Sequence, residues 1–314
     1  MITFLLICAG LVLLYLGAEL LVRGAVRTAV CLGVSPLVIG LTVVAYGTSA
    51  PELTVSIQAA LEHLGDLAAA NVVGSNTFNI ALILGVASLI CPISVGVQLV
   101  RQDVPVMIGV SLLCVLFLWD RRLSRLEGFF LFAGIVLYTA WIFYQAKRRP
   151  QPAAIPTSSV LPTGGKKGIW LAIIGCVGGL LFLVAGSKSL IVGSVRMARY
   201  FGVSEVIIGL TIVSGGTSLP ELATSVLAAI RRQPDIALGN IAGSNIFNIL
   251  AILGLSSLAV PYAAPGLTRF DLGMMLATAI LSLIFLRTRF TLSRLEGGIF
   301  LCIYAFYLWR LWPK

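Results

Sequence analysis

Two glutamate residues lie inside long apolar stretches of this sequence, and each directly follows a proline. Glu52 belongs to "GTSAPEL" and Glu221 to "GTSLPEL". A carboxylate at the centre of a bilayer costs about 2.5–3.5 kcal/mol to insert, and no lysine or arginine lies at comparable depth in these stretches to neutralise it. Each glutamate must therefore be protonated, satisfied by hydrogen bonds or bound to a cation.

The residues around the two glutamates supply further oxygen atoms. Pro51 and Pro220 remove a backbone hydrogen bond, so each helix should unwind and expose carbonyl groups to a cavity or a ligand. Hydroxyl and amide side chains recur at matching positions in the two halves of the chain: Thr48, Ser49, Ser75 and Asn79, and Thr217, Ser218, Ser244 and Asn248. An all-oxygen set of this kind selects a hard cation, and calcium takes about 6–8 oxygen ligands of mixed type. No cysteine or histidine is placed to favour a softer metal.

Structural roles are the alternatives for these residues. A protonated glutamate can hold helices together, and serine and threonine hydroxyls often bond to a carbonyl one turn earlier. Asn79 and Asn248 could likewise link neighbouring helices. We expect Asn76 and Asn245, beside glycines, to be structural, and the single histidine, His63, to be solvated in a loop.

The composition places these residues in a multi-pass membrane protein. Of 314 residues, 59% are hydrophobic and 11% are charged, with a mean hydropathy of +1.03, whereas soluble domains carry about 25% charge. Ten stretches are long enough to span a bilayer: 2–22, 35–60, 67–90, 104–119, 127–145, 168–195, 205–230, 236–259, 270–286 and 296–312. The six scattered cysteines indicate neither disulfides nor zinc, and no cofactor is predicted.

The second half of the chain repeats the first at a constant offset. Positions 33–58 align with 202–227 and positions 70–85 with 239–254, with more than half of the amino acids identical in each block and "GSNTFNI" on "GSNIFNI". Five helices per half is an odd number, so the second half must cross the membrane in the opposite sense. We therefore predict an all-α membrane protein with ten transmembrane helices in two inverted repeats of five. Broken second, third, seventh and eighth helices should form its core.

The repeats and charges define the expected organisation. The first repeat is 1–146 with its motif at 42–85, the second is 168–314 with its motif at 211–254, and 147–167 is a proline-rich linker. Assigning the loops alternately gives 13 basic residues on the linker's side and 9 on the other. The positive-inside rule then predicts a cytoplasmic linker and extracytoplasmic termini in the cell membrane. The net charge of +10 is spread over the loops, so it indicates neither nucleic acid nor an obligatory protein partner.

Other repeated motifs have a local explanation. Ser124 with Glu127, and Ser293 with Glu296, fit capping boxes that start helices. Ser35 followed by proline fits a helix N-cap. We expect these residues to be structural.

The two motif pairs resemble the α-repeats of the calcium/cation antiporter superfamily, particularly prokaryotic sodium/calcium exchangers, over essentially the whole chain. The resemblance implies four ion sites at mid-membrane. It implies that Glu52 and Glu221, with Thr48 and Thr217, bind calcium. Sodium would bind to the remaining polar groups, including two backbone oxygens: Ser49, Ser218, Ser75, Ser244, Asn79, Asn248, Ala45 and Ser214.

This chain departs from some archaeal relatives, which carry aspartate where it has Asn248. Potassium-dependent exchangers similarly carry aspartates at the positions of Asn79 and Asn248, so potassium independence is expected. The resemblance also implies that the first and sixth helices slide across a rigid core formed by the second, third, seventh and eighth helices.

We therefore predict an antiporter that exchanges calcium for sodium by alternating access. If both ions share Glu52 and Glu221, an empty, doubly negative site should not cross a low-dielectric interior, and exchange becomes obligatory. Calcium/proton exchange is the alternative, because two close carboxylates also attract protons. A cation channel would pass calcium without a counter-ion. An intramembrane hydrolase, and an enzyme in general, is not predicted because no serine–histidine or serine–lysine arrangement is apparent.

Overall fold

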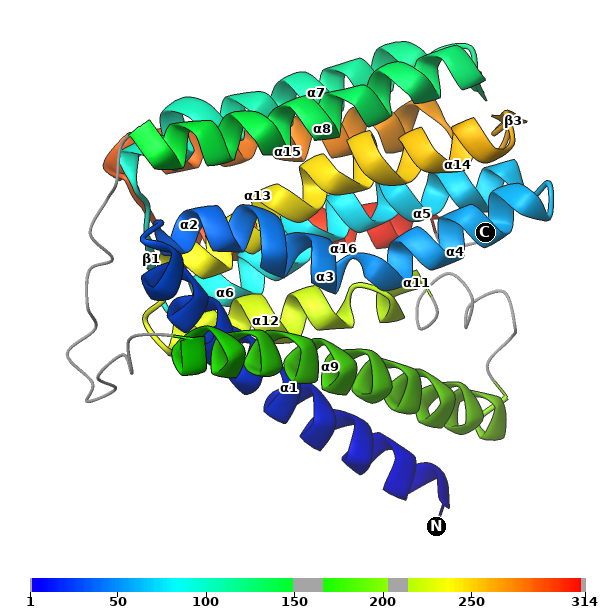
Figure 1. Cartoon of the computed structure of the whole chain (residues 1–314). Helices are drawn as coiled ribbons and strands as arrows, with labels where there is room; N and C mark the ends of the chain where they lie inside the picture. The colour runs from blue at the N-terminus through cyan, green and yellow to red at the C-terminus, as the bar shows by residue number, and fades with distance from the viewer. Residues whose placement is uncertain (1, 149–165, 203–213, 312–314) are drawn as a thin grey trace.

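The computed structural model describes residues 2–148, 166–202 and 214–311. Nearly all of them are helical, as predicted, and the helices form one bundle (Figure 1). The first half contains α1 (Ile2–Leu32), α2 (Pro36–Ile39), η1 (Gly40–Val44), α3 (Ala45–Thr48), α4 (Ala50–Leu61), α5 (Gly65–Thr77), η2 (Phe78–Leu84), α6 (Gly85–Ile90), β1 (Ile93–Ser94), η3 (Leu99–Asp103), α7 (Val104–Phe117), β2 (Arg122–Leu123) and α8 (Arg125–Arg148). The second half contains α9 (Lys166–Tyr200), α11 (Ser214–Gly216), α12 (Leu219–Ile230), α13 (Pro234–Phe247), η5 (Asn248–Leu253), α14 (Gly254–Ala259), β3 (Tyr262–Ala263), α15 (Arg269–Arg289), β4 (Thr291–Leu292) and α16 (Arg294–Leu311).

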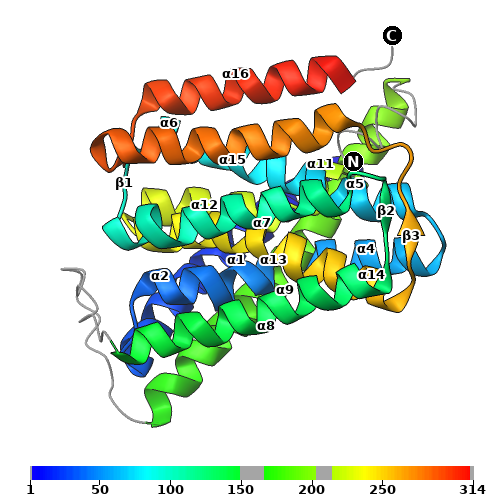
Figure 2. The same ribbon diagram turned by 90° about the horizontal axis from the view of Figure 1, so that it is seen from above.

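Two short antiparallel ribbons show that the halves are inverted. β1 pairs with β4 through Ile93 and Leu292, and β2 pairs with β3 through Leu123 and Tyr262. The ribbons lie at opposite ends of the bundle (Figure 2). The constant offset between the repeats carries Ile93 onto Tyr262, which therefore lies at the other end of the molecule. The two halves thus run in opposite directions.

Seven helices in the described parts of the chain are long and apolar enough to cross a membrane, and eight if the bent pair 36–48 and 50–61 is one span. Leu219–Ile230 is a shorter apolar helix, and most of the predicted stretch before it lies outside the described residues. Several helices extend past the predicted apolar stretches. α1, for example, continues past the predicted end at 22 as far as Leu32.

The prolines break the helices where the sequence predicts. α3 ends at Thr48, Ser49 has φ −83° and ψ 7°, and α4 begins at Ala50 with Pro51 in its first turn. The segments on the two sides of this break meet at an angle of 46°. Ser218 has the same conformation before Pro220, with φ −87° and ψ 9°. Each break places a glutamate in the first turn of a new helix.

The third and eighth helices differ from the expected broken form. They run unbroken over 65–90 and 234–259, and each contains a π-helical segment, η2 or η5. Asn79 lies in η2 and Asn248 is the first residue of η5. These helices contain no proline after their first turn, so a wider helical turn accommodates the change in register instead of a break. Such π-bulges are frequent at functional sites.

α1 and α9 pack along much of their lengths through regularly spaced glycines. A Cβ atom on Gly17 would lie 2.7 Å from the Leu183 nitrogen and 2.8 Å from the Gly179 oxygen. Gly10 and Gly24 face equally close backbone. Small residues allow membrane helices to approach closely, and here they join α1 and α9 into a pair.

Two acidic residues at helix ends are buried. The side chains of Asp103, at the end of η3, and Asp271, in the first turn of α15, are both almost inaccessible to solvent. Tyr138 Oη lies 3.5 Å from Asp103 Oδ1, and Tyr307 Oη donates to Asp271 Oδ1 over 3.1 Å. Each carboxylate thus packs against a tyrosine of another helix.

The expected caps are present. Ser124 and Ser293 each form a reciprocal capping box with the glutamate three residues later. Ser35 Oγ accepts a hydrogen bond from the Val38 nitrogen over 3.4 Å.

Candidate ion-binding site

The two glutamates lie fully buried at the breaks between α3 and α4 and between α11 and α12. Glu52 is 0% exposed and Glu221 is 1% exposed. Within the described residues neither forms an ion pair with a basic side chain, and no cluster of three or more His, Cys, Asp or Glu side chains occurs there. Two carboxylates are thus held in the protein interior by polar, uncharged neighbours.

Serines at the breaks connect the two halves reciprocally. Ser218 Oγ donates to Glu52 Oε1 over 2.7 Å, and Ser49 Oγ donates to Glu221 Oε1 over 2.8 Å. Ser218 Oγ also lies 3.3 Å from Ser75 Oγ. Each glutamate is therefore bonded by the opposite half, and the two carboxylates belong to one site.

Backbone and hydroxyl groups of the first break join the same network. Thr48 Oγ1 donates to Asn240 Oδ1 over 3.0 Å and lies 3.3 Å from the Ala45 oxygen. Ser244 Oγ donates to that same Ala45 oxygen over 3.4 Å. Thr217 is buried beside Ser218. The carbonyl of Ala45 thus faces polar side chains from both halves.

The asparagines divide into two kinds. Asn76 Nδ2 donates to the backbone oxygen of Asn245 over 3.1 Å, and Asn248 Nδ2 donates to Asn76 Oδ1 over 3.0 Å. This interhelical chain gives Asn76 the structural role expected of it and occupies the amide nitrogen of Asn248. Asn245 contributes only its backbone oxygen, and its own Nδ2 donates to the Ile241 oxygen over 2.7 Å. Asn79, in contrast, is buried, and neither of its amide atoms is hydrogen-bonded to a residue that the structure describes.

Several buried oxygen atoms near the breaks have no hydrogen-bond partner among the described residues, including Glu52 Oε2, Glu221 Oε2, Asn79 Oδ1 and Asn248 Oδ1. The segment η2, with Asn79, packs against α12, and η5, with Asn248, packs against α4. Leaving a buried polar group unsatisfied costs about 1–3 kcal/mol, and more for a charged group. A cation is the ligand that would satisfy carboxylate and amide oxygens together.

Two further asparagines hold the glutamate backbones. Asn71 Nδ2 donates to the Glu52 oxygen over 3.2 Å and to Ser56 Oγ over 2.8 Å. Asn240 Nδ2 makes the equivalent bonds to the Glu221 oxygen over 3.4 Å and to Ser225 Oγ over 2.9 Å. This pair was not predicted from the sequence, although both residues lie within the repeated positions 70–85 and 239–254.

Asn240→Leu keeps the size of the side chain but removes these bonds and the acceptor for Thr48. We expect it to weaken the apparent calcium affinity about tenfold, because Glu221 loses its fixed backbone position. Calcium titration of transport in vesicles measures this change. Asn240→Asp, which keeps an acceptor for Thr48, should be milder. Equal affinities in the leucine variant and the unmodified protein would show that Asn240 does not position the site.

Among the other predicted residues, Ser214 begins α11, and its side chain lies outside the described part of the structure. His63 is exposed at the end of α4, as expected.

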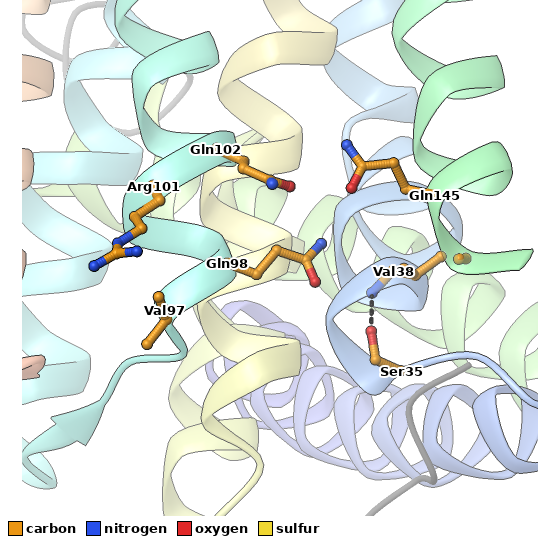
Figure 3. A pocket seen from close by; sticks show the side chains of 8 residues that line it. Ser35, Val38, Val97, Gln98, Arg101, Gln102 and Gln145 are labelled. Atoms are coloured by element: carbon orange, nitrogen blue, oxygen red, sulfur yellow. Dashed lines mark hydrogen bonds between the residues drawn. The ribbon is translucent and has the colours of Figure 1, made fainter. Parts of the chain in front are cut away.

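A polar cavity of about 310 Å³ lies away from the glutamates, between α2, η3 and the end of α8. Gln98, Gln102 and Gln145 extend into it, whereas Arg101 points away (Figure 3). It is separate from the candidate site because neither glutamate lines it.

These features define a multi-pass α-helical membrane protein with an inverted repeat, which is an architecture of secondary transporters. The model of the family described as sodium/calcium exchanger protein matches residues 2–144 and 171–312. The chain belongs to this family.

Several known proteins are similar over most or nearly all of the chain. The sodium/calcium exchanger MaX1 of Methanosarcina acetivorans is 34% identical, covering 98% of this chain and 97% of its own. The inner membrane protein YrbG of Escherichia coli is 38% identical, covering 82% of this chain and 79% of its own. A structure of the sodium-calcium exchanger NCX_Mj soaked with sodium and calcium superposes with a TM-score of 0.86 at 28% identity, covering 100% of this chain and 99% of that one.

Proposed function

We propose that this protein exchanges calcium for sodium across the cell membrane, with Glu52 and Glu221 as shared ligands. The observation that supports this proposal is the pair of fully buried carboxylates. Each has one oxygen bonded by a serine of the opposite half and one oxygen without a hydrogen-bond partner among the described residues. Two negative charges match one calcium ion, and the polar neighbours supply further oxygen ligands.

The proposal includes a role for each ligand. Thr48 and Thr217 would complete the calcium site with the glutamates. The sodium ions would bind to the surrounding oxygens, which calcium would share in part: Ser49, Ser218, Ser75, Ser244, Asn79, Asn248, Ala45 and Ser214. Because the ions compete for the same carboxylates, binding of one releases the other.

The organisation of the chain supports alternating access. Repeats 1–146 and 168–314 would form the two halves of the core, joined by the linker at 147–167. The basic residues favour a cytoplasmic linker and extracytoplasmic termini in the inner membrane. A C-terminal reporter that is active only in the cytoplasm should stay inactive. Reporter activity would show that the orientation is the opposite one, whereas the inverted repeat would still hold.

The coupling ion distinguishes the proposal from calcium/proton exchange. The unpartnered Oε2 atoms favour the latter as the second candidate, because a proton can also occupy them. Calcium uptake into vesicles that contain the purified protein should require an outward sodium gradient, and potassium gradients should have no effect. Uptake driven by a pH gradient in the absence of sodium would favour proton coupling instead.

A further inference from the structure

An ion pair joins α1 to the end of α12. Arg231 Nε and Nη2 each lie 2.9 Å from Glu19 Oε2, and Arg23 Nη2 lies 2.5 Å from Glu19 Oε1. The Glu19 side chain is only 13% exposed. The contact therefore ties the α1 and α9 pair to the helix whose first turn carries Glu221.

The repeat contains a second pair with the charges exchanged. The alignment of 33–58 with 202–227, continued along the chain, places Lys188 at the position of Glu19 and Glu62 at the position of Arg231. Glycines in the two helices support this alignment, because Gly10 and Gly17 in α1 correspond to Gly179 and Gly186 in α9. The residues after Glu62 and Arg231 also share a left-handed conformation, with φ 60° at 63 and 56° at 232.

The second pair is open in this structure. Glu62 Oε1 accepts a hydrogen bond from Gln58 Nε2 over 2.9 Å, and Lys188 forms no ion pair with any residue in the described parts of the chain. Lys188 nevertheless lies within the apolar span 168–200. A lysine in such a helix is unfavourable unless an acidic group pairs with it, so a contact with Glu62 would stabilise Lys188.

The packing shows the same asymmetry. α1 lies along α12, whereas α9 makes no comparable contact with α4 among the described residues, although α9 and α4 correspond to α1 and α12. The α1 and α9 pair is thus displaced toward one side of the core. In an inverted repeat, exchanging the conformations of the two halves converts one access state into the other. That exchange turns the contact of Glu19 with Arg231 into a contact of Lys188 with Glu62.

We infer that Lys188 and Glu62 form an ion pair in the opposite access state, so that each state is held by its own charged contact between the α1 and α9 pair and the core. This inference rests on the proposed exchange by alternating access. Partly exposed ion pairs are weak, so each should bias the balance between the states by a few-fold and still release during transport.

A zero-length carbodiimide tests this inference, because it joins an amine to a carboxylate only when the two are in contact. It does not couple a guanidinium to a carboxylate, so the contact between Glu19 and Arg231 gives no cross-link. Vesicles that exchange calcium should yield a covalent link between the peptides that contain Lys188 and Glu62, measured by mass spectrometry. Glu62→Gln and Lys188→Gln should each abolish it.

Releasing the first contact should favour the second. Arg231→Gln should raise the yield of the link about 2–5-fold, as expected for the loss of a weak ion pair, whereas Arg232→Gln, its neighbour, should leave it unchanged. Vesicles that exchange calcium but yield no link under any ion condition would overturn the inference, as would an unchanged yield in Arg231→Gln. If the cross-link forms in a protein that does not exchange calcium, the contact between Lys188 and Glu62 is supported but the proposed function is contradicted.

Discussion

Glu52→Gln should reduce calcium transport by about 100-fold or more while the protein still inserts and folds. The glutamine keeps the size of the side chain and one acceptor for Ser218, which donates to Glu52 over 2.7 Å. Under the proposed function it removes one of two buried negative charges that would bind a doubly charged ion, and removing one partner of a buried charge pair costs about 3–5 kcal/mol. Initial rates of calcium uptake into sodium-loaded vesicles measure this loss.

The other variants of the site should follow from its symmetry. Glu221→Gln should match Glu52→Gln, and the double variant should add little, because the two carboxylates act as a unit. Asn79→Ala and Asn248→Ala should be milder, since water can replace part of a neutral ligand. Glu127→Gln is the matched control, because glutamine also serves in a capping box. Near-normal exchange by a well-inserted Glu52→Gln protein would refute shared ligands.

Gly17→Leu should abolish transport by separating α1 from α9. Even the first atom of the new side chain would lie 2.7 Å from the Leu183 nitrogen, and backbone cannot move aside as a flexible side chain can. Overpacking of this kind typically costs about 1–3 kcal/mol and occasionally more. Gly17→Ala should show a smaller loss of the same kind. Thermal stability in detergent and calcium uptake should fall together.

Gly178 provides the control for this prediction, because it lies on α9 and a Cβ atom there would meet nothing within 4 Å. Gly178→Leu should keep both stability and transport close to those of the unmodified protein. If Gly17→Leu and Gly178→Leu behave alike, close packing between α1 and α9 is not required.

Much of the fold could be predicted because the bilayer requires long apolar helices and the internal repeat relates the two halves of the sequence. The apolar stretches marked the helices, and an odd number of them per half required inversion. The prolines at 51 and 220 marked the breaks, since proline cannot complete the helical hydrogen bonds. The structure confirmed the helical fold, the breaks before Pro51 and Pro220 and the capping boxes at Ser124 and Ser293.

The remaining features depend on contacts between distant segments. The π-helical segments η2 and η5 have no local signal, because their residues are ordinary helix formers. Asn71 and Asn240 donate hydrogen bonds to the backbone carbonyl groups of Glu52 and Glu221 on a neighbouring helix, and these contacts can be seen only in the folded structure. Tyr138, which packs against the buried Asp103, is likewise far from it in the sequence.

The most direct test of obligatory exchange is calcium release from loaded vesicles that contain the purified protein. In a medium without sodium or calcium the vesicles should retain their calcium, because the doubly negative empty site cannot return. Adding sodium outside should start rapid release, and Glu52→Gln vesicles should not respond. Calcium that leaves at the same rate with and without external sodium, through the unmodified protein, would contradict an exchange mechanism and indicate a channel.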